Sequence, residues 1–313
     1  MNLATFPEKA NDAIRFTTFP KKRNDATNLT TFPKKEAAIM NLTISRGAAP
    51  LLSIDDLRVK FHNRDREAVA GVSLSIGQGE IVGLVGESGS GKTVTAMSVA
   101  GLLPRKRCAY SGEILLDGVE LLHADRVTLR KVQGRSIGVV FQDPLSCMDP
   151  LMKVGAQVEE TLLLHTDLSK RERRQLALEA LEAVELPDPE RVYASWPHEL
   201  SGGMRQRACI AAAMVIRPTL LLLDEPTTAL DVTVQAQILT LLKKLNRESG
   251  ISMLFISHNL GVIRKLCTRA AVMQSGVIVE EGDTERVFRQ PRHPYTRRLI
   301  DAIPTRDGRR ESA

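Results

Sequence analysis

The stretch Gly86-Glu87-Ser88-Gly89-Ser90-Gly91-Lys92-Thr93 decides how the core of this chain folds. It follows the apolar run Glu80 to Val85 and precedes a helical pattern from Val94 to Leu103. A buried strand, a G-x-x-x-x-G-K-[ST] loop and a helix are the parts of a phosphate-binding loop, in which backbone N–H groups and the helix N-terminus attract anions. The stretch therefore predicts an ATP site in which Lys92 reaches the β- and γ-phosphates and Thr93 is a ligand of Mg²⁺. The alternative, an ordinary glycine-rich turn, leaves the lysine, the hydroxyl and the flanking elements unexplained.

A pair of carboxylates follows a second apolar run. Leu220 to Leu223 reads as a buried strand, and Asp224 and Glu225 come directly after it. Phosphoryl transfer needs an acid that holds Mg²⁺ and a group that orients the attacking water. We expect Asp224 to hold the metal and Glu225 to polarise the water. Many strands end in solvated acids, but the loop at Gly86 favours the catalytic interpretation.

The rest of the chain alternates strand and helix signals, which predicts an α/β fold with a mostly parallel sheet. Ile251 to Ile256 is another short apolar run, and Val272 to Val279 indicates a hairpin. The pattern becomes helical over about 143–213, where Ser169 and Glu172 form a capping box that opens a helix through about Val184. We interpret this part as a helical subdomain.

Charge and cysteine usage exclude several classes of protein. The net charge of +6 lies in the two ends, +3 in residues 1–39 and +3 in residues 291–313, so residues 40–290 are neutral. We therefore expect no nucleic-acid groove on the body, although the ends could contact anionic lipid or nucleic acid. The apolar runs are shorter than a membrane-spanning helix requires. The four cysteines form no C-x-x-C pair, which argues against a zinc site or a disulfide framework.

Residues 1–39 contain a short near-repeat, Thr-Phe-Pro followed by charged residues, centred on Phe6, Phe19 and Phe32. Copies this short cannot stack into a core. We interpret residues 1–39 as a disordered leader or an upstream start, with Met40 opening the domain; a partner-binding arm is the alternative. The sequence then predicts an ATPase domain over 40–290 and a tail over 291–313.

One further motif resembles a known family. Leu200-Ser201-Gly202-Gly203-Met204-Arg205-Gln206 is similar to the signature motif of ABC ATPases and precedes Asp224, as in that family. The resemblance implies a P-loop NTPase core, an antiparallel β subdomain and an α-helical signature subdomain. It also implies that Ser201, Gly202 and Gly203 cap the γ-phosphate of ATP bound by the other subunit of a dimer. Simple helix capping by Ser201 is the alternative.

Other family elements occur in the same order. Gln142 resembles the glutamine that senses Mg²⁺ and the attacking water, and Asp231 resembles the aspartate at the dimer interface. His258 resembles the switch histidine that contacts the γ-phosphate. Phe61 is the best candidate for the aromatic residue that stacks on adenine, although an apolar strand residue is an equal interpretation. Asn259 stands where the family commonly has Asp, which removes no catalytic group.

The resemblance is closest to ATPases of oligopeptide, dipeptide and nickel importers, on Gln142-Asp143-Pro144, His293-Pro294-Tyr295-Thr296 and Ala302-Ile303-Pro304. It implies a peripheral protein on the cytoplasmic face of the cell membrane. Its partners would be transmembrane permeases, a second ATPase subunit, identical or related, and an extracytoplasmic substrate-binding protein. A non-transport ABC ATPase that acts on ribosomes or DNA is the alternative, but such proteins usually carry two cassettes. A P-loop kinase or GTPase leaves Ser201 and His258 unexplained.

Overall fold

The computed structural model describes residues 49–143, 147–228 and 230–303. These residues belong to one compact unit. The predicted leader, residues 1–39, lies outside the described residues, as do Pro144, Ala229 and the end of the predicted tail from Pro304. No helix in the described part of the chain is long and apolar enough to cross a membrane.

Six strands form the central sheet, in the order β10-β9-β3-β8-β7-β6. Neighbouring strands from β9 to β6 are parallel, and β10 pairs with β9 in the antiparallel sense. The bounds of the strands are β3 Ile81–Val85, β6 Ile137–Val140, β7 Leu220–Asp224, β8 Ser252–Ser257, β9 Arg269–Gln274 and β10 Val277–Asp283. The predicted parallel sheet is confirmed, and the predicted hairpin is the pair of β9 and β10.

A second, antiparallel sheet has the order β2-β1-β4-β5. Its strands are β1 Leu52–Phe61, β2 Val69–Ile76, β4 Cys108–Leu116 and β5 Val119–Glu120. The helix α2, Arg126–Val132, follows these strands in the chain and begins at Asp125, whose side chain accepts a hydrogen bond from the N–H of Thr128. The antiparallel β subdomain that the family resemblance implied is therefore present.

The central sheet is buried on both faces, because alternate residues of its strands pack into two different cores. In β7, Leu221 and Leu223 belong to one hydrophobic cluster and Leu220 and Leu222 to the other. Successive side chains of a strand point to opposite faces, so a strand covered on both sides must be apolar at every position. This explains why the strands appear in the sequence as uninterrupted apolar runs.

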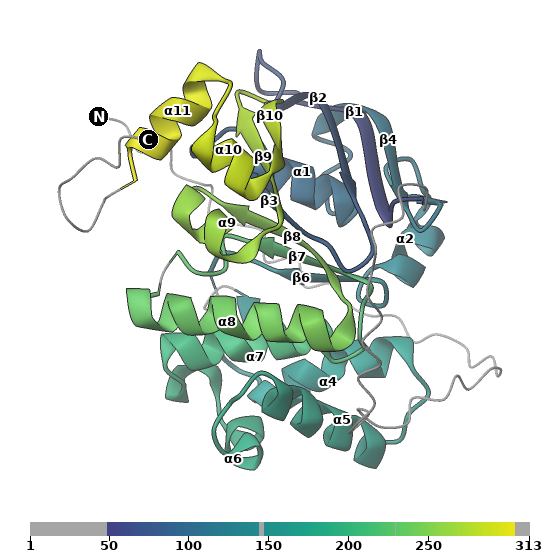
Figure 1. The fold of residues 1–313 in the computed structure, drawn as a ribbon. Coiled ribbons are helices and arrows are strands. Elements are labelled where there is room, and N and C mark those ends of the chain that lie inside the picture. The colour runs from purple at the N-terminus through teal and green to yellow at the C-terminus, as the bar shows by residue number, and fades with distance from the viewer. Residues whose placement is uncertain (1–48, 144–146, 229, 304–313) are drawn as a thin grey trace. The chain divides into compact units, whose positions relative to one another are not determined.

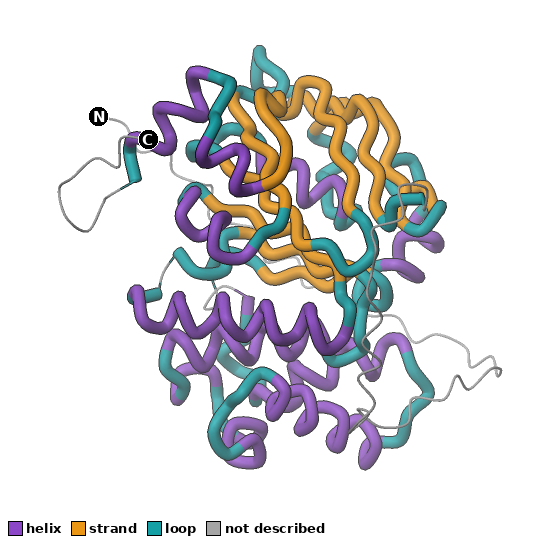
Figure 2. Tube along the Cα trace, viewed as in Figure 1, coloured by secondary structure: helices purple, strands orange, loops and turns teal. Residues whose placement is uncertain are grey.

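Most helices gather on one side of the central sheet, whereas the antiparallel sheet, α2 and the helix after the phosphate loop lie toward its other side (Figure 1). Figure 2 separates the strand-rich and helix-rich parts in the same view. The helical subdomain comprises α4 Val154–His165, α5 Lys170–Ala183, α6 Pro189–Ala194, the 3₁₀ turn Pro197–Glu199 and α7 Gly202–Met214. The predicted capping box opens α5: Glu172 N–H donates to Ser169 Oγ, and Ser169 N–H donates to the Glu172 carboxylate.

The remaining helices are α1 Lys92–Val99, α8 Val232–Ser249, α9 Leu260–Leu266, α10 Thr284–Arg289 and α11 Pro294–Asp301. The helix after the phosphate loop was expected over Val94 to Leu103 but begins at Lys92 and ends at Val99. It ends early because Gly101 has a φ of +67°, and the N–H of Leu102 donates to the carbonyl of Met97. A glycine in this conformation closes a helix, which the apolar pattern alone does not reveal.

Candidate functional site

The phosphate loop connects β3 to α1, and its glycines are required by close contacts. A Cβ on Gly86 would lie 2.1 Å from the carbonyl oxygen of Met273, and one on Gly91 would lie 2.4 Å from that of Ala68. Gly91 also has a φ of +110° at the start of α1, a conformation that favours glycine. The loop can therefore pack tightly against β9 and against the residue before β2. The N-terminus of α1 then lines a cavity with Gly91, Lys92 and Thr93.

Lys92 is the first residue of α1, and its side chain folds back over the loop. Its Nζ donates to the carbonyl oxygens of Gly86 and Glu87, each at 2.8 Å. The residue is 4% exposed, and burial lowers the pKa of its ammonium group, whereas the nearby carboxylates of Glu225 and Asp224 raise it. The ammonium group is thus held beside the loop, at the edge of the cavity that it lines.

Asp224 ends β7 and meets Thr93 of α1. Burial raises the pKa of the Asp224 carboxyl, and a hydrogen bond from the Thr93 hydroxyl acts in the opposite direction. Asp224 is 7% exposed, and its Oδ1 has no hydrogen-bond partner among the residues that the structure describes. A buried carboxylate oxygen without a donor, next to a hydroxyl, is a donor set that Mg²⁺ prefers. These residues fit the predicted metal.

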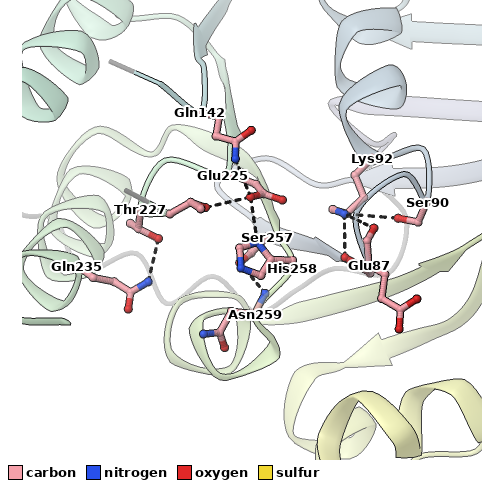
Figure 3. A network of polar contacts seen from close by, with 12 residues as sticks. Glu87, Ser90, Lys92, Gln142, Glu225, Thr227, Gln235, Ser257, His258 and Asn259 are labelled. Atoms are coloured by element: carbon pink, nitrogen blue, oxygen red, sulfur yellow. Dashed lines mark hydrogen bonds and ion pairs between the residues drawn. The ribbon is translucent and has the colours of Figure 1, made fainter. Parts of the chain in front are cut away.

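Glu225 lies at the centre of a second group of polar contacts. Its Oε2 accepts hydrogen bonds from Gln142 Nε2 at 3.2 Å and from Thr228 Oγ1 at 2.9 Å, and it lies 2.9 Å from His258 Nδ1. Figure 3 shows Gln142, Glu225 and His258 turned toward one another, with Lys92 beside them. The φ of Glu225 is +48°, an uncommon conformation for a residue other than glycine.

Lys92, Thr93 and the Glu225 group share one cavity of about 1290 Å³, whereas Asp224 lines the neighbouring cavity of about 730 Å³, which shares Gln142 with the first. The larger cavity is lined by the phosphate loop, Lys92 and Thr93 on one side and by Gln142, Glu225 and His258 on the other. The structure therefore brings together residues that are up to about 170 positions apart in the sequence. A cavity of this size, with backbone N–H groups, a lysine, hydroxyls and carboxylates, can hold a nucleoside triphosphate and a water molecule beside its terminal phosphate.

Phe61 does not line this cavity. Its ring is partly buried against the core of the antiparallel sheet, and the loop that follows it, residues 63–68, forms that end of the cavity. Alternation along β1 places this strand residue toward the core, whereas the loop is free to cover the site. Thr228, Ser275 and Gly276 also line the cavity, and no sequence motif indicated them.

The residues of the signature motif lie outside this cavity. Ser201 begins α7 and its Oγ accepts a hydrogen bond from the N–H of Met204, whereas Asp231 begins α8 and accepts hydrogen bonds from the N–H groups of Thr233 and Val234. Neither residue, nor Gly202 or Gly203, lines the cavity of its own chain. Both the capping alternative and the interface interpretation are compatible with this position.

Outside the cavity, Tyr295 of α11 is a contact that the sequence did not indicate. Its hydroxyl accepts a hydrogen bond from the N–H of Glu87, in the phosphate loop, at 3.0 Å. All four cysteines are free thiols in the structure.

A buried strand, a phosphate loop that opens a helix and an acidic pair at the end of another parallel strand of the same sheet define a P-loop nucleotide-binding protein. Comparison with protein families identifies the family within this class. Residues 69–228 match the model of the ABC transporter family, and residues 279–313 match that of the oligopeptide/dipeptide transporter C-terminal region. The chain belongs to the ABC transporter family of ATPases.

Two relatives show how far the similarity extends. A Brucella melitensis protein with the provisional name of peptide import ATP-binding protein is 49% identical over 263 residues, which cover 82% of this chain and 78% of that protein. The oligopeptide transport ATP-binding protein OppD of Bacillus subtilis is 45% identical over 258 residues, or 82% of this chain and 72% of OppD.

Solved structures agree with the fold. The ATP-binding cassette MJ0796, in a dimeric post-hydrolysis state with bound ADP and phosphate, superposes with a TM-score of 0.66 at 32% identity, over 74% of this chain and 98% of that cassette. The cbiO1 subunit from Clostridium perfringens, part of the transporter complex cbiONQ, gives a TM-score of 0.68 at 28% identity, over 78% of this chain and 92% of cbiO1.

Proposed function

We propose that this chain is the subunit that drives a peptide importer by binding and hydrolysing ATP. The observation that carries the proposal is the cavity in which Lys92 and Thr93 of α1 face Gln142, Glu225 and His258. Relatives named for peptide import and the match of residues 279–313 support peptides as the cargo. Nickel is the other cargo that the sequence resemblance left open.

In this proposal each residue of the nucleotide site has one task. Lys92 and the N–H groups of residues 86–93 hold the phosphates of ATP. Thr93, Gln142 and Asp224 hold Mg²⁺, which would neutralise charge on the phosphate oxygens. Glu225 accepts the proton of the attacking water, and His258 orients Glu225 through the 2.9 Å contact and reaches toward the γ-phosphate.

The site is completed by a second subunit. Ser201, Gly202 and Gly203 lie outside the cavity of their own chain, and Ser201 and Gly202 lie at the N-terminus of α7, which can attract a phosphate. We assign Ser201, Gly203 and Asp231 to the dimer interface, where they would face ATP bound by the partner. The dimeric form of the similar cassette MJ0796 supports this arrangement.

The permeases would dock between the core and the helical subdomain. A second cavity, of about 730 Å³, lies there and includes Phe141, Met148 and Gln142 in its lining. Leu151, Leu163 and Leu164 are exposed in the same subdomain, and Leu151 is 81% exposed. In this proposal these leucines contact the permeases. Because Gln142 lines both cavities, docking could act on the catalytic group directly. The assembly would sit on the cytoplasmic face of the membrane and receive its cargo from an extracytoplasmic binding protein.

Isolation of the tagged full-length chain from native membranes tests the assignment. We expect copurified polytopic permeases, and we expect the complex in proteoliposomes to couple ATP hydrolysis to uptake of short peptides. Uptake of Ni²⁺ without peptide uptake would exclude the peptide cargo. Recovery of ribosomes or DNA without any permease would contradict transport itself.

A further inference from the structure

A buried carboxylate anchors the start of α11. Glu280 of β10 accepts hydrogen bonds from the N–H of Arg292 at 3.0 and 3.2 Å and from the N–H of His293 at 3.0 Å. Burial raises the pKa of Glu280, but these N–H donors, together with Thr296 and the charge of Arg286, hold the pKa below its usual value. An ionised carboxylate that accepts backbone N–H bonds is a strong contact. The turn before α11 is therefore fixed to β10.

The anchored turn positions Tyr295. The ring of Tyr295 is 3% exposed and packs in the hydrophobic cluster on the helical side of the central sheet. Its hydroxyl accepts the hydrogen bond from the N–H of Glu87, 208 positions earlier in the chain. Tyr295 does not line the nucleotide cavity, so it would act on the nucleotide only through the phosphate loop.

The hydrogen bond between Glu87 and Tyr295 involves a peptide group whose N–H and carbonyl both have partners. The N–H of Glu87 and the carbonyl of Gly86 belong to the same planar peptide, and that carbonyl accepts a hydrogen bond from Lys92 Nζ at 2.8 Å. Rotation of this peptide would break both contacts. The Tyr295 hydroxyl thus fixes the direction of one of the two carbonyl oxygens that hold the lysine.

We propose that Tyr295 is a positioning residue of the ATP site, through which the C-terminal segment sets the affinity of the phosphate loop for nucleotide. The segment lies in the part of the chain that matches the oligopeptide/dipeptide transporter C-terminal region. The proposal concerns ATP binding by the chain itself, and it does not depend on which cargo is transported.

Tyr295→Phe tests the proposal in the full-length chain, because it removes the acceptor oxygen and keeps the ring. We expect the KM for ATP and the Kd of a fluorescent ATP analogue to rise about fivefold, the factor expected from one lost hydrogen bond, with kcat within about twofold of the wild type. Tyr110→Phe, in the antiparallel sheet, is the matched control and should change neither constant. Unchanged KM and Kd in Tyr295→Phe, with or without a lower melting temperature, would overturn the proposal.

Amide hydrogen exchange of the nucleotide-free chain gives a second measurement that needs no ATPase activity. We expect faster exchange in the peptide that contains Glu87 in Tyr295→Phe, and unchanged exchange there in Tyr110→Phe. Equal rates in the wild type and Tyr295→Phe would show that the hydroxyl does not hold the loop. If the wild type itself fails to hydrolyse ATP, the proposed function fails, and the exchange rate at Glu87 still decides whether Tyr295 holds the loop.

Discussion

Replacement of Glu225 by Gln isolates the chemical step from ATP binding. The substitution keeps the shape of the side chain and an oxygen that can accept from Gln142 and Thr228. It removes the carboxylate that, in our proposal, takes a proton from water. A positioned general base contributes ~100- to 10,000-fold to a rate, or about 3 to 5 kcal/mol of transition-state stabilisation. Lys92, Thr93 and Asp224 are unchanged. We therefore expect kcat to fall by about that factor, while ATP binds normally.

Phosphate release measures kcat, and a fluorescent ATP analogue measures binding. Gel filtration with ATP and Mg²⁺ should also show a dimer that persists, because ATP is no longer consumed. Glu285→Gln is the matched control: Glu285 forms an exposed ion pair with Arg264, and its loss should change kcat less than about twofold. Undiminished hydrolysis in Glu225→Gln would refute the role of Glu225 as the base.

Three further predictions concern stability and the shared site. Asp224→Asn should raise the stability of the nucleotide-free chain at neutral pH, because burial raises the pKa of the Asp224 carboxyl and so disfavours its ionised form in the folded state. The gain should shrink as the pH falls through the raised folded-state pKa toward the ordinary aspartate pKa of ~4. Thermal unfolding at several pH values measures the gain, and a gain that is the same at every pH would contradict this account. Lys92→Ala and Ser201→Arg chains, each inactive alone, should recover up to about a quarter of the wild-type activity when they are mixed. A mixed dimer keeps one intact site, because the unchanged Lys92 of one chain faces the unchanged Ser201 of the other. Phosphate release that stays at background at every mixing ratio would oppose a shared site. Ser169→Ala should cost about 1 kcal/mol in urea unfolding, because it breaks the capping box with Glu172; an unchanged midpoint would show that this cap contributes little.

The sequence was most informative where one local pattern requires one local structure. The phosphate loop, the strand that ends at Asp224 and the capping box at Ser169 each depend on nearby residues, and the structure has all three. The continuous apolar runs indicated strands buried on both faces, and β7 and β8 have that environment. Local patterns of this kind can be recognised in the sequence without knowledge of tertiary contacts.

Long-range contacts could not be predicted in the same way. Phe61 is apolar and precedes the loop that ends the cavity, but its ring is partly buried against the core of the antiparallel sheet. The bond between Tyr295 and Glu87 joins residues 208 positions apart, and no local pattern at Tyr295 indicates its partner. The early end of α1 depends on the left-handed conformation of Gly101, which packing determines as much as propensity does.

The most direct test of the account is the specific ATPase activity of the purified chain as a function of its concentration. The cavity holds Lys92, Glu225 and His258, but Ser201 to Gly203 do not line it, so one chain carries half of the proposed site. We predict that ATP binds at all concentrations, and that hydrolysis per chain rises with concentration to a plateau as the dimer forms. Specific activity that is constant across the range in which light scattering gives a monomer would contradict the shared site.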